Sequence, residues 1–229
     1  MPLEINGTPI EGRIEIGGTE IVEVQVNGTT VYLPHRTIDD FEHNDIPAYY
    51  TDPSGTGTVD TTSVAAYDGS YGVHFDGQRE IYSVPGDGLP NYYERGTWAE
   101  FWIRPISTDS AHSYWVAFGG STSDWDNHYT VKLFMDGAFR VDRREDGSLT
   151  TVADDDGTDV SYSTQWYRVE FLADPDQIRA RLYDSSGTRL ENLQGDENTD
   201  RFSWPGKLAL RCNDGEMYAD EIRMNSLIV

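Results

Sequence analysis

Lysine is almost missing from this chain of 229 residues. Only Lys132 and Lys207 are lysines among the 17 basic residues, which face 40 acidic residues and leave a formal net charge of −23. Binding to nucleic acid depends on clustered basic side chains that neutralise phosphates, and the sequence contains no such stripe. We therefore expect no nucleic-acid partner.

Long apolar runs and cysteine are also scarce. No run approaches the roughly 18 apolar residues that a membrane-spanning helix needs, so we expect no membrane insertion. The polar stretch after Met1 does not read as a secretory signal. The single cysteine, Cys212, excludes an internal disulfide, and its place in the strand-like run "LALRC" predicts a small buried side chain.

The acidic excess has its own pattern. Aspartate outnumbers glutamate by 25 to 15, and aromatic residues make up 12% of the chain, which argues against disorder. Self-repulsion at −23 is tolerable where salt screens it, and at about 1 M salt the Debye length is roughly 3 Å. The depletion of lysine and the excess of aspartate resemble the proteins of salt-loving archaea and their viruses, which implies a working environment of molar salt.

Short alternating segments separated by turn residues fill most of the chain. Turns are predicted at Asp136-Gly137, Asp146-Gly147 and Ser186-Gly187, and no segment has a helical period. The pattern predicts an all-β fold, an antiparallel β-sandwich or barrel. In "GTWAEFWIRP", strand alternation assigns one face to Trp98, Glu100, Trp102 and Arg104 and the other face to Ala99, Phe101 and Ile103.

Three short repeats open the chain. Asn6-Gly7, Gly17-Gly18 and Asn27-Gly28 each lie between β-branched residues, as in a hairpin with a type I′ turn. A hairpin this short is not stable alone, so it must pack on the main domain, on a symmetry mate or on another protein. We predict a docking or oligomerisation module over residues 1–36, with a simple flap on the main domain as the alternative. These strings resemble the N-terminal ends of tail and fibre proteins of tailed viruses.

The chain from Ile38 onward resembles the concanavalin A-like lectin/glucanase jelly roll, in its laminin-G-like branch. The resemblance is carried by "DDFEHNDIPAYY", "AAYDGSYGVHFDG", "GTWAEFWIRP", "QWYRVEF" and "MYADEIRM". It implies an antiparallel β-sandwich (jelly roll) over residues 38–229, preceded by the small N-terminal β-hairpin module.

The same resemblance implies a structural calcium ion (Ca2+). In many jelly rolls of this kind, acidic residues at the start and the end of the domain converge on the ion. Here these would be Glu42 and Asp220, with Asp68 and its neighbours supplying a backbone carbonyl and Asp40 as an extra ligand. Calcium prefers six to eight oxygen ligands, and accepts backbone carbonyls among them. The alternative is that these are ordinary surface carboxylates in an acidic protein.

Catalysis is not expected. Glucanases of this fold carry two catalytic acids on one strand, as E-x-D-x-x-E or E-x-D-x-E, and the sequence lacks both patterns. Glu100 and Glu170 are predicted on separate strands, whereas a retaining mechanism needs two carboxyl groups about 5–5.5 Å apart. We therefore expect a protein that is not an enzyme.

Aromatic residues in loops are the candidate sugar contacts, because exposed aromatic rings are typical of binding rims. Four tryptophans lie within predicted strands, and most of them are expected in the core: Trp98, Trp102, Trp115 and Trp166. Strand alternation also places Arg104, Arg140 and Arg168 on faces that could be concave, where they would offer a site for acidic sugars. The loop candidates are Trp125, Tyr49, Tyr50, Tyr92, Tyr93 and Trp204.

Together these expectations describe a virion surface protein of a virus of salt-loving archaea. The hairpins would dock it to other virion proteins or to itself as a symmetric trimer or pentamer. The sandwich would act as an adhesin for a host surface glycan or glycoprotein. Such a protein would be made in the host cytoplasm and leave inside the assembled particle, without a signal peptide. The alternatives are a purely structural virion decoration and a carbohydrate-binding module of a cellular glycan-active protein.

Overall fold

A computed structural model gives the fold of the chain. It describes the side chains of residues 39–46, 50, 55–81, 96, 98–107, 109–120, 126–155, 162–202, 204 and 206–224. It describes the backbone alone at residues 4–5, 8–9, 15–16, 19–20, 24–26, 29–32, 35–38, 51, 82–83, 97 and 225–226. Within these parts of the chain, no helix is long and apolar enough to cross a membrane.

Antiparallel strands make up most of the described chain, joined by turns and by two short 3-10 helices. The elements are β1 (Glu4–Ile5), β2 (Thr8–Pro9), β3 (Glu15–Ile16), β4 (Thr19–Glu20), β5 (Val24–Val26), β6 (Thr29–Tyr32), β7 (His35–Asp39), β8 (Tyr50–Thr51), β9 (Thr56–Thr62), η1 (Ser63–Ala65), β10 (Gly72–Ser83), β11 (Thr97–Pro105), β12 (Ser113–Gly119), β13 (His128–Phe134), β14 (Phe139–Glu145), β15 (Ser148–Asp155), β16 (Tyr167–Ala173), β17 (Gln177–Tyr183), β18 (Arg189–Asp196), η2 (Thr199–Arg201), β19 (Lys207–Asn213) and β20 (Glu216–Ser226).

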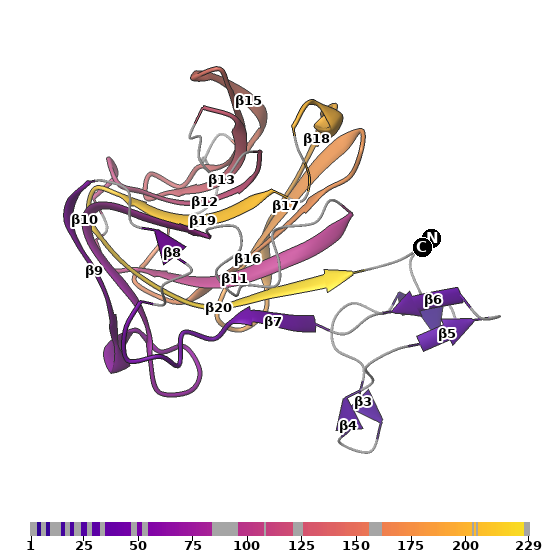
Figure 1. Ribbon diagram of the computed structural model, residues 1–229, viewed down its shortest axis with the longest axis horizontal. Coiled ribbons are helices and arrows are strands. Elements are labelled where there is room, and N and C mark those ends of the chain that lie inside the picture. Colours follow the sequence, from indigo (N-terminus) through magenta and orange to yellow (C-terminus); the bar gives the residue numbers. More distant parts are fainter. Residues whose placement is uncertain are drawn as a thin grey trace.

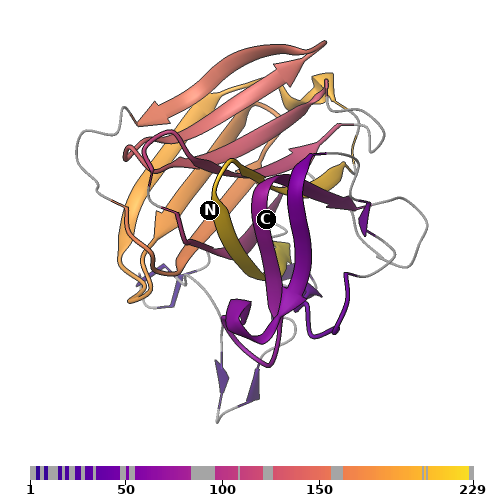
Figure 2. The ribbon, with the colours of Figure 1, turned by 90° about the vertical axis from the view of Figure 1, so that its left-hand side faces the viewer.

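Two sheets lie one above the other and share β10 (Figure 1). The first sheet has the order β9-β10-β20-β11-β16-β17-β18, with β7 also on β20. The second has the order β10-β19-β12-β13-β14-β15, with β8 also on β10. The beginning of β10 pairs with β9 and β20, and its end pairs with β19, so this strand forms the corner between the layers. Figure 2 views that corner, with β9 and β10 side by side in front. The predicted all-β antiparallel sandwich is confirmed.

Gly77 marks the place where β10 leaves one sheet for the other. Its φ is +87°, and its N–H donates to the carbonyl of Gly215, in the β19–β20 turn, at 2.7 Å. A Cβ atom at this position would lie 2.5 Å from the carbonyl oxygen of Thr56. The bend therefore needs both the conformational freedom and the small size of glycine.

Strand alternation fills the space between the sheets. On β11, Ala99, Phe101 and Ile103 are buried in the core while Trp98 and Glu100 point away from it, as the sequence predicts. Cys212 is fully buried, also as predicted. The largest fully buried side chains include Tyr114, Tyr129, Tyr167, Phe41, Phe75, Phe118, Phe139 and Phe171.

The last strands of the two sheets, β15 and β18, lie against each other. Gly195 on β18 is so close to Val152 on β15 that a Cβ atom would come within 2.6 Å of that valine's side chain and carbonyl oxygen. This side of the sandwich is closed by contact between the two layers, because no shared strand joins them here.

The N-terminal repeats form three separate two-stranded sheets, β1–β2, β3–β4 and β5–β6. In each sheet the two strands pair antiparallel, with Ile5 opposite Thr8, Ile16 opposite Thr19 and Val26 opposite Thr29. These are the minimal hairpins that the sequence predicts. β7 already pairs with β20 from His35 onward, so the sandwich begins there. Division into a separate module of residues 1–36 and a domain of residues 38–229 stays a prediction.

Candidate functional site

A row of charged and aromatic side chains crosses the outer face of the second sheet. Each residue of the row has at least one strand neighbour that lies in the core or packs against it, as Tyr114 and Val116 do on either side of Trp115. Strand alternation therefore points the row outward. We call this surface the Trp115 face. In order across β10, β19, β12, β13, β14 and β15, the row consists of Glu80, Arg211, Trp115, Lys132, Arg140 and Asp154.

Trp115 lies between two cations. The Lys132 Nζ atom is 4.2 Å from the centre of the indole ring, and the Arg211 guanidinium carbon is 4.7 Å from it. The indole N–H donates to the Ser113 hydroxyl at 2.7 Å. These contacts fix a partly exposed ring in one orientation. The expectation that Trp115 lies in the core is wrong, because an apolar residue on either side of the strand gives the same sequence pattern.

The β10 end of the row is a network of planar polar groups. Arg211 donates to Glu80 at 3.1 Å and to the Asn213 side chain at 3.3 Å, and Gln78 donates to the same Asn213 oxygen at 3.0 Å. A hollow of about 90 Å³ opens here. Its lining consists of Gly55, Gln78, Arg79, Glu80 and Arg211.

The β13–β14 part of the row rests on a buried ion pair. The Lys132 ammonium lies 2.7 Å from Asp142, and the two residues are 4% and 0% exposed. The Thr151 hydroxyl also donates to Asp142, at 2.9 Å. Burial lowers the pKa of Lys132, and the hydrogen bond with Asp142 opposes that shift. More exposed pairs lie on either side: Arg140–Asp154 at 3.0 Å and Arg144–Asp126 at 3.5 Å.

Small side chains follow Trp115 along the sheet. Ala117 is paired with Ala209 on one side and with Thr130 on the other. All three are 2% exposed, so this part of the face is covered and the exposed part lies around Trp115. The Thr130 hydroxyl is buried and has no hydrogen-bond partner among the described residues.

His128 continues the face beyond Thr130. It is 2% exposed, and its pKa is lowered to about 2, first by burial and then by the positive charges of Lys207, Arg144, Lys132 and Arg211. The imidazole is therefore neutral at ordinary pH. Both lysines of the chain lie on this one face, which the scarcity of lysine in the sequence does not by itself reveal.

This combination suits the recognition of a sugar. An indole ring offers a flat apolar surface for the C–H face of a pyranose or furanose ring. Guanidinium, carboxylate and amide groups offer fixed donors and acceptors for the hydroxyl groups around that ring. Rigid placement of these groups by internal contacts reduces the entropy lost on binding.

The outer face of the first sheet carries a different network, which we call the Glu100 face. Strand register places Glu100 opposite Glu170, so residues on separate strands become direct neighbours. Burial raises the pKa of both carboxyl groups. Arg168 lies 4.0 Å from Glu100 and 3.2 Å from Glu170. Arg223 adds a contact to Glu100 at 3.7 Å, and Arg181 one to Glu170 at 3.6 Å.

These contacts have a consequence for catalysis. A pair of glycosidase carboxyl groups must be free to protonate the leaving group and to attack the sugar. Each glutamate of this pair instead contacts two arginines. We interpret the pair as a structural ion network.

The predicted loop aromatics have separate locations. Tyr50 does not lie at a rim: it is 8% exposed and stacks on Phe41 with ring centres 5.8 Å apart. Trp204 is partly buried against the core, where its indole N–H donates to the Thr199 carbonyl at 2.8 Å. Trp125, Tyr49, Tyr92 and Tyr93 lie outside the described residues.

The three arginines considered together in the sequence are divided between the faces. Arg140 belongs to the Trp115 face. Arg168 lies on the Glu100 face, and Arg104, 5.9 Å from the Tyr218 ring, is on the same sheet. Local sequence patterns do not assign these arginines to different faces, because the assignment depends on strand register between residues that are distant in the sequence.

The residues predicted to bind calcium are hydrogen-bonded to one loop. Glu42 accepts from the N–H groups of Ser70 and Tyr71 at 2.6 and 3.1 Å. Asp220 accepts from the N–H groups of Tyr67 and Asp68 at 2.6 and 3.2 Å. The turn after β7 and the last strand, β20, thus both hold residues 67–71. N–H groups contact these carboxylates where calcium would need oxygen atoms, and calcium at Glu42, Asp220, Asp68 and Asp40 stays a prediction.

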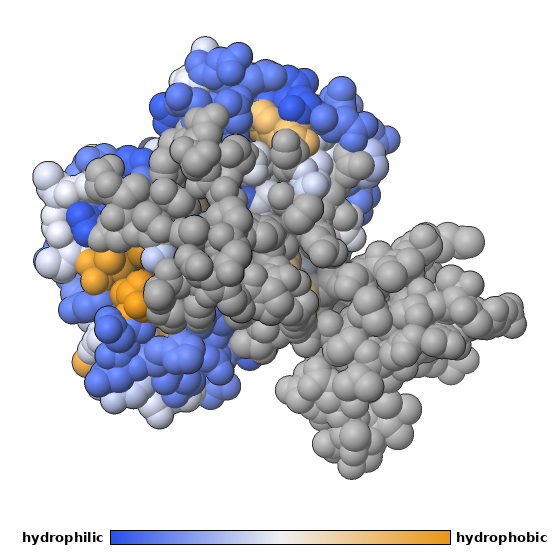
Figure 3. Space-filling model, in the orientation of Figure 1, coloured by the Kyte–Doolittle hydropathy of each residue, from blue (hydrophilic) through white to orange (hydrophobic). Residues whose placement is uncertain are grey.

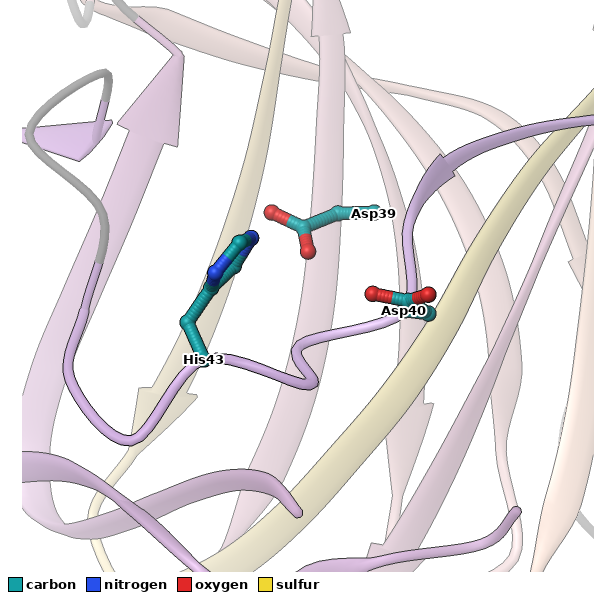
Figure 4. Close-up of side chains that lie close together, drawn as sticks. All are labelled: Asp39, Asp40 and His43. Atoms are coloured by element: carbon teal, nitrogen blue, oxygen red, sulfur yellow. The ribbon is translucent and has the colours of Figure 1, made fainter. Parts of the chain in front are cut away.

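A second group with possible metal ligands follows β7. The side chains of Asp39, Asp40 and His43 place one ligand atom each within 4.8 Å of the others (Figure 4). Asp39 accepts a hydrogen bond from the Phe41 N–H at 2.7 Å, and Asp40 one from the Glu42 N–H at 3.2 Å. These contacts form a tight turn that buries Phe41, which explains the cluster without a metal.

A larger hollow of about 510 Å³ lies where η2 meets the ends of β14 and β18. Arg143 and Arg201 both contact Glu197 there, at 2.8 and 2.9 Å. None of the residues that line it, as far as the structure describes them, is aromatic. The Trp115 face is therefore the better candidate for binding a sugar.

Comparisons with known proteins give the fold. No protein-family profile matches the sequence, and no curated protein is similar enough to match. Among solved structures, the chain is similar to the carbohydrate-binding module CBM66 from Bacillus subtilis (TM-score 0.53, 13% identity, 78% of this chain and 96% of that one). It is also similar to a galectin-like protein of unknown function from Bacillus subtilis (0.54, 10%, 86% and 96%). A third is domain 4 of an extracellular arabinanase from Geobacillus stearothermophilus, solved with arabinotriose (0.51, 16%, 84% and 90%). At these identities the likeness shows the fold alone, which is an antiparallel jelly-roll sandwich.

Proposed function

We propose that this chain is a non-enzymatic, lectin-like protein that binds glycan through the Trp115 face. The observation that carries the proposal is the indole ring of Trp115, held between Lys132 and Arg211 within a row of planar polar groups. It is supported by the fold, which is shared with a module named for carbohydrate binding and with a domain solved with an oligosaccharide.

We further propose the setting that the sequence suggests: the virion surface of a virus infecting salt-loving archaea, with a host surface glycan as ligand. The net charge of −23 and the presence of only two lysines support molar salt. Figure 3 shows a surface that is mostly hydrophilic where it is described, with hydrophobic colour confined to small areas. The repeated N-terminal hairpins support docking to virion proteins or to further copies of the chain.

A purely structural decoration of the virion is the second candidate. It is favoured by the same hairpins and would leave the Trp115 face without a ligand. A carbohydrate-binding module of a cellular protein is the third, and it would share the binding chemistry of the first.

The deciding experiment measures binding of the full chain, in molar salt, to intact haloarchaeal cells and to their isolated surface glycoprotein. We expect saturable binding that is lost on deglycosylation and weakened about 30-fold by Trp115→Ala, the size of a central aromatic contact. Trp98→Ala is the matched control, because Trp98 lies on the other face beneath Arg181 at 4.3 Å.

Three outcomes separate the candidates. Binding that Trp115→Ala weakens about 30-fold and Trp98→Ala preserves supports the lectin. Binding that Trp115→Ala leaves unchanged locates the glycan site elsewhere and overturns the proposal. No saturable binding to cells or glycoprotein favours the structural decoration.

A further inference from the structure

Positive charge is concentrated on the Trp115 face out of proportion to the whole chain. The protein has 17 basic and 40 acidic residues, but among the described residues of this face five basic ones meet four acidic ones. The five are Lys132, Lys207, Arg140, Arg144 and Arg211, and the four are Glu80, Asp126, Asp142 and Asp154.

The order of the charges matters as much as their number. Glu80 and Asp154 occupy the two ends of the row, so its centre carries only cations and the indole ring. Strand register makes Lys132 and Arg140 direct neighbours, a like-charge pair that is unfavourable without an anion between or above them. Asp142 lies beside Lys132 but is fully buried and already bound to it.

Two of the arginines keep unused donors. A guanidinium has five N–H groups, and Arg140 uses a terminal nitrogen for Asp154 while Arg144 uses one for Asp126. The side chains of both are about a third exposed, so their remaining terminal N–H groups can reach a ligand. Exposed donors at a binding face favour a ligand rich in acceptors. Burial is the largest cause of the low pKa of His128, and the positive charges of this face lower that pKa further.

We propose that the Trp115 face takes an anionic glycan, in which separate carboxylate or sulfate groups are held by Arg140 and by Arg144 while one sugar ring lies on Trp115. This inference rests on the proposed glycan-binding function and specifies the ligand class. Long-range repulsion between the ligand and a chain of charge −23 is screened in molar salt, whereas direct contacts at the face persist. The same acidic surface disfavours other polyanions where the salt concentration is low.

The test uses two pairs of polysaccharides that differ only in charge: polygalacturonate with its methyl-esterified form, and dextran sulfate with dextran. Binding of the full chain is measured at about 1 M salt, where the Debye length is roughly 3 Å. We expect the charged member of at least one pair to bind about tenfold tighter or better. Arg140→Gln and Arg144→Gln should each remove about tenfold of that preference, as expected for one charge-assisted hydrogen bond.

Arg181→Gln, on the other face, is the control and should change nothing. Unfolding curves of each variant confirm that the fold is retained. Equal affinity for both members of each pair overturns the anionic preference and leaves glycan binding intact. Failure to bind any of the four probes, while Trp115-dependent binding to host glycoprotein persists, also overturns the preference alone. Loss of the host binding overturns the proposed function with it. Equal losses in Arg181→Gln and Arg140→Gln mean non-specific charge attraction and overturn the inference.

Discussion

The two outer faces of the sandwich carry similar side chains in opposite order. Across the first sheet, Glu100 and Glu170 are central, with Arg223 and Arg181 on either side. Across the second sheet, cations are central and the acids lie at the ends. Each face even has a tryptophan beneath an arginine: Trp98 in one case and Trp115 in the other.

The two faces differ in how their like-charge pairs are compensated. The Glu100–Glu170 pair contacts three arginines, all within the same network. The Lys132–Arg140 pair has one carboxylate for each cation, and the one bound to Lys132 is buried. At the Glu100 face arginines contact a central pair of acids, whereas at the Trp115 face the cations are central and Arg140 and Arg144 are about a third exposed. This arrangement of charge, more than the number of aromatic rings, distinguishes the candidate site from its counterpart.

The largest expected effect comes from breaking the buried pair beneath the Trp115 face. Asp142→Ala leaves the Lys132 ammonium buried without its carboxylate, so we expect the free energy of unfolding to fall by about 3–5 kcal/mol. Chemical denaturation in molar salt measures it.

Asp154→Ala is the matched control for that substitution. Its carboxylate contacts Arg140 on the same face but is about a third exposed, and the expected loss is below about 1 kcal/mol. Similar losses in the two variants would show that burial does not distinguish the two ion pairs.

The next effect concerns Gly77, where the shared strand passes from one sheet to the other. Gly77→Ala should cost about 3 kcal/mol, because the new Cβ would meet the Thr56 carbonyl and the φ is positive. Gly187→Ala has nearly the same φ, at +82°, but nothing lies near its added Cβ, so about 1 kcal/mol is expected. Thermal unfolding compares the two, and equal losses would contradict a steric requirement at the corner.

The smallest effect is a difference in how the faces respond to acid. The pKa of His128 is lower in the folded chain than in the unfolded chain, so the unfolded state binds more protons as the pH falls below about 6.5. The His128 contribution to stability should therefore fall by about 1.4 kcal/mol per pH unit below that value. His128→Gln should remove this slope in denaturation curves between about pH 6.5 and pH 5.

The Glu100 face should respond with the opposite sign. Burial raises the pKa of Glu100 and of Glu170, so the folded state takes up protons at higher pH than the unfolded state does. Their contribution to stability should rise as the pH falls through the folded-state pKa values toward 4.5. Glu170→Gln should reduce that gain, and a variant that instead steepens acid destabilisation would contradict it.

Local sequence patterns predict much of the fold. Positive φ values at Asp146 and Gly147 confirm the turn that this dipeptide predicts. The side chains of β11 alternate as its sequence indicates. Short turns and strand alternation depend on residues that are close together in the sequence, so local patterns are enough to predict them.

The candidate site depends on pairings that no local pattern contains. Arg211 reaches Trp115 only because β19, almost 100 residues later in the chain, inserts between β10 and β12. Tyr50 looked like a rim residue because of its Pro-rich surroundings, yet its strand packs it on Phe41. Register and long-range order of the strands decide which faces these side chains share.

The contact between β15 and β18 affects how the protein stays soluble. A free strand edge is a template for pairing with another molecule. In dilute solution a charge of −23 would keep copies apart, but molar salt removes that protection. Where Gly195 lies against Val152, the two terminal strands cover each other, so protection from self-association at that point is steric and independent of ionic strength.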